Sequence, residues 1–190
     1  MNPIFTVNYP ELLVAEYLQK HFGKKSGHSV LMPLSGQQKG YDLALMRRTS
    51  TGTKVATFQV KSSRTYTGSP GVSARTKIRT FAHYMWLRTF VVPPEADFFV
   101  LLGLYAPNPT TLKNTIGVWR PHILLFTHAE MTQLMSGLRQ RRTNAPETHF
   151  GFGFDNAQQA FLTRGHAQPQ HPDYSPRVLG ACHSVIQAAL

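Results

Sequence analysis

Three polar residues interrupt two apolar segments of the chain, and their side chains are of kinds that can bind a divalent cation or a phosphate. Asp42 lies at the start of the segment 41–48, and Gln59 and Lys61 lie in the segment 54–61. An aspartate, an amide and a lysine are costly to bury without partners, so either these side chains face solvent or a site uses them. Carboxylate and amide oxygens suit a hard cation such as Mg²⁺, and a neighbouring lysine can orient a water molecule beside a phosphate. Together the three residue types indicate phosphodiester hydrolysis.

The spacing of the two segments predicts a β-hairpin that brings these side chains together. The sequence TSTGT between them is a glycine-containing turn. With the turn centred near Thr51, the numbers of paired residues sum to roughly 102, which places Asp42 opposite Val60. Gln59 and Lys61 are two residues apart, so they share one face of their strand. We therefore expect the carboxylate, the amide and the ammonium to converge at one end of the hairpin.

A second carboxylate, Glu11, is expected on the core-facing side of a helix over residues 10–22. At 100° per residue, Glu11 shares an apolar stripe with Ala15 and Leu18, whereas Glu16 lies about 140° away, among polar residues. A carboxylate on the apolar side of a helix needs a cation or a hydrogen-bond donor. Glu11 stands near the start of the helix, from which it could reach a site at the edge of the core.

The other segments predict an α/β fold with a central mixed sheet flanked by helices. We expect a core domain over residues 1–143 and a C-terminal extension over residues 144–190 that packs on the core or trails from it. Residues 78–90 are expected to form either a helix or a buried segment, with the helix favoured. The further elements expected along the chain are a strand from residue 28, a buried strand at 96–105, one bent strand or two strands at 116–126, a helix at 127–142 with a capping box made by Thr127 and Glu130, a proline-rich connector at 165–177 and a helix near the C-terminus.

The charge of the chain indicates a polyanionic partner. Twenty Lys and Arg residues face nine Asp and Glu residues, which gives a formal net charge of +11 over 190 residues. Nucleic acid is the first candidate, ahead of an anionic membrane surface, because no basic amphipathic helix stands out. The longest apolar run is too short to cross a bilayer, and the one cysteine excludes a cysteine-rich zinc site. We expect a cytoplasmic protein without a signal peptide.

At these residues the chain resembles the PD-(D/E)xK nuclease superfamily, whose members share the restriction-endonuclease-like fold. The matching parts are PELLVAEYL on the first helix, YDLAL on the second strand and FQVKSS on the third. The chain is most similar to members with a QxK third motif, near Holliday-junction resolvases and restriction endonucleases. The resemblance implies an endonuclease that hydrolyses DNA with Mg²⁺ or Mn²⁺. It also implies roles for five residues: Asp42, Glu11, Gln59 and the backbone carbonyl of Val60 as metal ligands, and Lys61 as the catalytic lysine.

Gln59 departs from the pattern of the superfamily, in which most members have a glutamate or an aspartate at this position. The neutral amide removes one negative charge from the metal site, so Mg²⁺ affinity is expected to fall unless Glu11 compensates. The alternative function is a nucleic-acid-binding protein with the same fold and little or no catalytic activity. Asp42 would then cap the entry of a strand, and Lys61 would end an edge strand.

Basic residues near the expected site would contact the nucleic-acid backbone without reading its sequence. Duplex or branched DNA is the expected partner, RNA stays open, and a homodimer would suit double-strand cleavage because one site cuts one strand. Four aromatic residues at 81–90 fit a buried core better than a base-stacking platform. The residues expected to bind nucleic acid are Lys39, Arg64, Arg75, Lys77 and Arg79.

Overall fold

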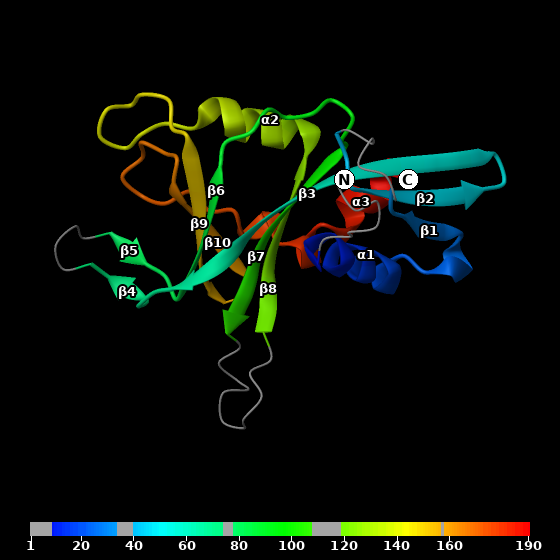
Figure 1. The fold of residues 1–190 in the computed structure, drawn as a ribbon, viewed down its shortest axis with the longest axis horizontal. Coiled ribbons are helices and arrows are strands. Elements are labelled where there is room, and N and C mark those ends of the chain that lie inside the picture. Colours follow the sequence, from blue (N-terminus) through cyan, green and yellow to red (C-terminus); the bar gives the residue numbers. More distant parts are fainter. Residues whose placement is uncertain (1–8, 34–39, 74–77, 108–118, 157) are drawn as a thin grey trace, which may run out of the picture.

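The computed structural model describes residues 9–33, 40–73, 78–107, 119–156 and 158–190, in which strands predominate (Figure 1). The helices are α1 (Tyr9–His21), α2 (His128–Gly137) and α3 (His183–Ala189), with 3₁₀ turns η1 (Lys24–Ser26), η2 (Ser175–Arg177) and η3 (Leu179–Ala181). The strands are β1 (His28–Leu31), β2 (Leu43–Thr49), β3 (Gly52–Thr67), β4 (Gly71–Val72), β5 (Arg79–Thr80), β6 (His83–Arg88), β7 (Phe98–Pro107), β8 (Trp119–Thr127), β9 (His149–Asn156) and β10 (Gln159–Arg164).

Eight of the strands form one sheet, which confirms the expected mixed α/β class. β1, β2 and β3 are antiparallel, β7 runs parallel to β3, and β8 is antiparallel to β7. The far end of β3 pairs with β6, which continues through β9 to β10, all antiparallel. β4 and β5 form a separate two-stranded ribbon. Residues 144–190 therefore supply two strands of the same sheet, together with α3.

The 16-residue strand β3 lies between two apolar cores, and one of its faces contributes to the first of them. Ala56, Phe58 and Val60 belong to the first core, which α1 and α3 cover. The second core lies on the opposite face, where Phe99 and Leu101 of β7 meet inward-facing residues of β6, β9 and β10 and the apolar side of α2. Figure 1 shows β3 running diagonally between the two regions.

The helices begin where the sequence indicates, and α2 ends earlier than expected. Thr127 accepts a hydrogen bond from the backbone N–H of Glu130, and the Glu130 carboxylate accepts one from the backbone N–H of Thr127, so the capping box is confirmed. The last turn expected up to residue 142 is absent, because Leu138 is extended and Arg139 pairs with Pro146 in a β-bridge. Within the described residues, no helix is long and apolar enough to cross a membrane.

The prediction of a helix at 78–90 is wrong, because this segment contains the strands β5 and β6. In β6, Met85 and Leu87 are buried while Trp86 and Arg88 are exposed, which is the two-residue period of a strand with one covered face. The expected hairpin register is also wrong by one residue. Paired residues sum to 101, as in Leu43 opposite Phe58, so Asp42 lines up with Gln59 instead of Val60.

Candidate functional site

Asp42 and Gln59 meet where β2 begins and β3 continues past it. The backbone N–H of Asp42 donates to the carbonyl of Phe58 over 2.8 Å, one residue out of register with the β2–β3 ladder, which ends at Leu43. The Asp42 carboxylate turns back onto β3. Its Oδ2 accepts a hydrogen bond from the amide nitrogen Nε2 of Gln59 and another, of 2.7 Å, from the backbone N–H of Val60. Gln59 is buried, so this carboxylate satisfies an amide that would otherwise lack a partner.

Lys61 lies on the same face of β3 as Gln59, beside an aromatic ring. Its ammonium nitrogen is 5.6 Å from the ring centroid of Phe90, which packs against the second core. This distance is within the range of a cation–π contact, and the lysine is half-buried. The structure therefore brings three of the expected site residues to one face: Asp42, Gln59 and Lys61.

Glu11 comes from an element on the other side of the sheet. It lies in the first turn of α1, and the residues that share its stripe, Ala15 and Leu18, are buried in the first core. The amphipathic pattern predicted for this helix is thus confirmed, with Glu11 half-buried at its N-terminal end. Gln59 and Lys61, in contrast, project from the face that carries the second core.

A further acid, Glu95, lies close to the start of the Asp42 segment and was not expected from the sequence. Gly40 adopts a φ of +90°, and a Cβ there would collide with the carboxylate of Glu95. The backbone carbonyl of Glu95 accepts a 2.7 Å hydrogen bond from the hydroxyl of Thr57, a residue on the same face of β3 as Gln59. Gly40 and Glu95 are far apart in the sequence, and the parallel pairing of β3 with β7 brings the segment at 95–97 beside β3.

The candidate metal ligands do not form a ready-made carboxylate cluster. Among the described residues, no group of three His, Cys, Asp or Glu side chains is arranged to hold a metal ion. Asp42 already accepts two protein hydrogen bonds through Oδ2, and Gln59 presents its donor nitrogen to that oxygen. A cation bound by both side chains would require the Gln59 amide to turn its oxygen toward the ion. Val60 contributes its N–H to Asp42, and its side chain belongs to the first core.

No protein-family model, curated protein or solved structure matches the chain.

The basic residues expected to bind nucleic acid are described in part. Arg64 lies on β3 with its guanidinium 4.9 Å from the ring of Tyr66. Arg79 forms a 2.6 Å ion pair with Asp155 and also lies over Phe81. Arg64 is thus exposed and available to a phosphate, whereas Arg79 already has an anionic partner. Lys39, Arg75 and Lys77 lie outside the described residues.

Histidines that are scattered in the sequence form two hydrogen-bonded pairs in the fold. His122 and His83 lie 3.1 Å apart between ring nitrogens, and His166 and His171 lie 3.0 Å apart. Burial, and then the neighbouring His83, lower the pKa of His122 to about 4. Burial, and then the neighbouring His171, lower the pKa of His166 to about 4. Both buried rings are therefore neutral near pH 7 and act as parts of the core.

Proposed function

We propose that the chain is a metal-dependent endonuclease that hydrolyses phosphodiester bonds in DNA. The observation that carries the proposal is the hydrogen bond between Asp42 and Gln59 just before β2 begins, with Lys61 on the same face of β3 as Gln59. A restriction-endonuclease-like core belongs to the same proposal. The strand order β1–β2–β3–β7, in which the β3–β7 pair is parallel and the β1–β2 and β2–β3 pairs are antiparallel, supports it. The net charge of +11 supports a polyanionic substrate, duplex or branched.

The site residues would divide the work of hydrolysis by their chemistry. Asp42 would be the principal ligand of Mg²⁺ or Mn²⁺, with the Gln59 amide oxygen and the Val60 carbonyl as further ligands that the superfamily pattern implies. Glu11, which the pattern also implies, stands on α1 across the sheet and would have to reach the ion around the edge of the sheet. A divalent cation supplies charge neutralisation at the phosphate and a more acidic bound water. Lys61 is held beside Phe90 on the same face, and its ammonium would orient the attacking water or offset charge on the phosphate.

A cleavage assay with matched variants tests this proposal. Plasmid, branched and single-stranded DNA, and RNA of the same sequences, are incubated with Mg²⁺ or Mn²⁺. We expect nicking by the wild type and loss of cleavage in Lys61→Ala without loss of DNA binding, because the lysine acts in the transition state. Lys54→Ala is the matched control, since Lys54 is an exposed lysine on the same strand. Asp42→Asn should lose cleavage and metal binding together.

Two outcomes would contradict the endonuclease. One is a wild-type chain that cuts none of the substrates with either metal. The other is an Asp42→Asn variant that binds metal and cuts as the wild type does. A homodimer, if it forms, would set two such sites on opposite strands, and linearisation of a plasmid without a prior nick would reveal it.

The second candidate is a nucleic-acid-binding protein that keeps the fold without cleaving. The hydrogen bonds of Asp42 favour it, because both go to protein donors and one of them is the amide that replaces the usual carboxylate. Such a chain would bind DNA with an affinity that falls steeply with salt, and the logarithms of affinity and salt would be linearly related with a slope of several units. A slope near zero would contradict both candidates.

A further inference from the structure

The outer surface of β6 and its neighbours carries aromatic rings and arginines in place of a covering layer. Met85 and Leu87 of β6 point into the second core. The alternate residues of β6 therefore point outward, and Trp86 and Arg88 are exposed. We name the outer surface formed by Arg64 and Tyr66 of β3, Tyr84 and Trp86 of β6, Gly151 of β9 and Arg164 of β10 the aromatic–arginine face.

The strand register aligns these residues in two neighbouring rows. Tyr66 lies directly opposite Tyr84. In the next row Trp86 lies opposite Gly151, and Gly151 lies opposite Arg164 on its other side. The rings of Tyr84 and Trp86 are nearly parallel, at 16° and 6.0 Å between centroids. The rows therefore place three rings on adjacent positions of one sheet surface.

Gly151 lets the indole of Trp86 lie flat on the sheet. A Cβ at residue 151 would come 2.8 Å from the Trp86 ring and 2.8 Å from the backbone oxygen of Met85, so a side chain there would push the ring away. With its inner side against bare backbone, the indole turns its other side outward, and 37% of Trp86 is exposed. Tyr66, at 41%, is similarly open. Flat, exposed rings of this kind are surfaces on which a nucleobase can stack.

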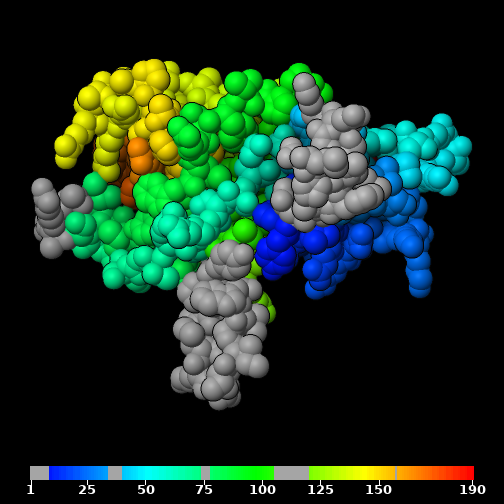
Figure 2. All heavy atoms as spheres, in the orientation of Figure 1, coloured from blue at the N-terminus to red at the C-terminus, as the bar shows by residue number. Residues whose placement is uncertain are grey.

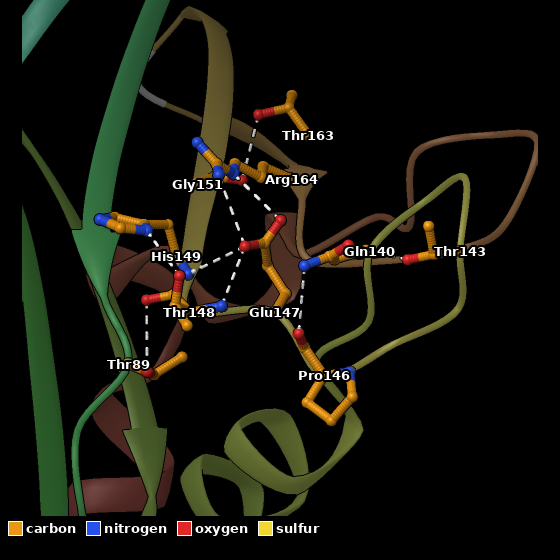
Figure 3. Close-up of polar contacts among 10 residues, drawn as sticks. All are labelled: Thr89, Gln140, Thr143, Pro146, Glu147, Thr148, His149, Gly151, Thr163 and Arg164. Atoms are coloured by element: carbon orange, nitrogen blue, oxygen red, sulfur yellow. Dashed lines mark hydrogen bonds and ion pairs between the residues drawn. The ribbon is translucent and has the colours of Figure 1, made fainter.

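Arg164 is fixed beside the indole by an ion pair. Figure 3 shows the Glu147 carboxylate between the Arg164 guanidinium and the backbone N–H groups of Thr148 and His149. The Arg164 Nε lies 3.3 Å from Glu147, and the guanidinium lies 5.9 Å from the Trp86 ring. The Arg164 side chain is still 44% exposed. Arg64 also lies over an aromatic ring, with 4.9 Å between its guanidinium carbon and the centroid of the Tyr66 ring.

We propose that the aromatic–arginine face binds unpaired nucleotides of a single-stranded nucleic-acid segment. Aromatic rings interleaved with cations offer stacking to the bases and charge to the phosphates, whereas a duplex hides its base faces. The partner's class rests on the proposed function and on the charge of +11. Tyr66 follows Lys61 by five residues on β3, an odd number, so the two side chains point to opposite faces of the strand. The aromatic–arginine face is therefore a surface separate from the proposed metal site.

Binding in EDTA, where no metal-dependent cleavage occurs, tests the inference. Fluorescence anisotropy is measured with a labelled single-stranded DNA of mixed sequence, its RNA counterpart and the matching duplex. We expect the wild type to bind the single strands more tightly than the duplex. Trp86→Ala and Tyr66→Ala should each weaken single-strand binding roughly 5- to 150-fold, the range measured for one base–aromatic stack. Trp86→Phe keeps a ring and should retain most of the affinity.

The matched control is Val55→Ala, which removes an exposed apolar side chain at the distant hairpin end of the same strand. It should bind as the wild type does. The inference is overturned if the duplex binds as tightly as the single strands, or if both ring-to-alanine variants bind like the wild type while thermal melting shows them folded. If the wild type binds single strands through this face but cuts none of the substrates, only the proposed cleavage is contradicted. If the wild type cuts DNA and both ring-to-alanine variants bind single strands as it does, only this inference is contradicted.

Discussion

Replacing Gln59 with glutamate would set two carboxylates against each other where the structure has an amide–carboxylate hydrogen bond. At a separation of roughly 3 Å and an effective dielectric constant of about 20, two unit charges repel by about 5 kcal/mol. Holding the new carboxyl protonated at pH 7 costs less, about 4 kcal/mol, so the metal-free variant is expected to take up a proton and lose about that much stability. For a chain of this length, such a loss lowers the melting temperature by roughly 8–16 °C.

The sign of the pH effect separates this mechanism from simple misfolding. The pKa of the new glutamate is raised in the folded state, so the loss of folding stability grows as the pH rises above the pKa of this glutamate in the unfolded chain. Near pH 5 the loss should be only about 1 kcal/mol. Millimolar Mg²⁺ or Mn²⁺ should restore most of the loss, because a cation between the carboxylates removes their repulsion. Thermal melting at pH 5 and pH 7, in EDTA and with added metal, measures both the pH dependence of the stability loss and its recovery with the cation.

Gln133→Glu is the control for the Gln59→Glu experiment, because it makes the same change at an exposed position of α2. It should melt close to the wild type with or without metal. If Gln59→Glu melted like the wild type in EDTA at pH 7, the side chain of residue 59 would not lie against Asp42. If the loss appeared but no divalent cation restored it, these two side chains would not form a cation site.

Three further variants test the fold around the site. Burial lowers the pKa of His122 to about 4 in the folded state, so its contribution should reduce the free energy of unfolding by about 2 kcal/mol between pH 6.5 and about pH 5. His122→Phe should lack this part of the acid destabilisation when the free energy of unfolding is measured in urea titrations. Thr127→Ala removes the α2 cap and should cost about 1 kcal/mol, which Thr127→Ser should avoid; equal melting of both variants would contradict the capping role. Gly151→Ala should displace Trp86 and change its fluorescence, whereas Gly180→Ala, where a Cβ meets no atom within 4 Å, should not.

The local pattern of the sequence predicted the elements whose side chains alternate or repeat clearly. The two strands around the turn at Thr51 formed as expected, and Asp42 met Gln59 although the register differed by one residue. The stripe of α1 and the capping box of α2 also follow from neighbours in the sequence. A turn can shift by one residue with little local cost, so the register was the part that local pattern could not determine.

Features that depend on distant segments were not predictable from the sequence. Glu95 lies near Gly40 because β7 pairs in parallel with β3. The segment at 78–90 is rich in aromatic residues, and this composition hid the alternation of β6, whose outward position for Trp86 depends on where β9 lies. The aromatic residues were expected to be buried together, and the structure buries Phe81 but exposes part of Trp86.

The first core is covered by α1 and α3, two helices that the ribosome synthesises at very different times. Leu18 of α1 is buried in a cluster that also contains Leu179, Ile186 and Leu190, and Tyr17 is hydrogen-bonded to His183 of α3. α1 lies beside α3 in Figure 1, and the blue atoms of the α1 segment lie at the surface of the face shown in Figure 2. During translation α1 leaves the ribosome early, yet the residues that close its core follow more than 150 positions later. In that interval the apolar stripe of α1 and the inner face of β1–β3 are exposed to chaperones and to other nascent chains. The first core can therefore close only after residues 179–190 have been synthesised.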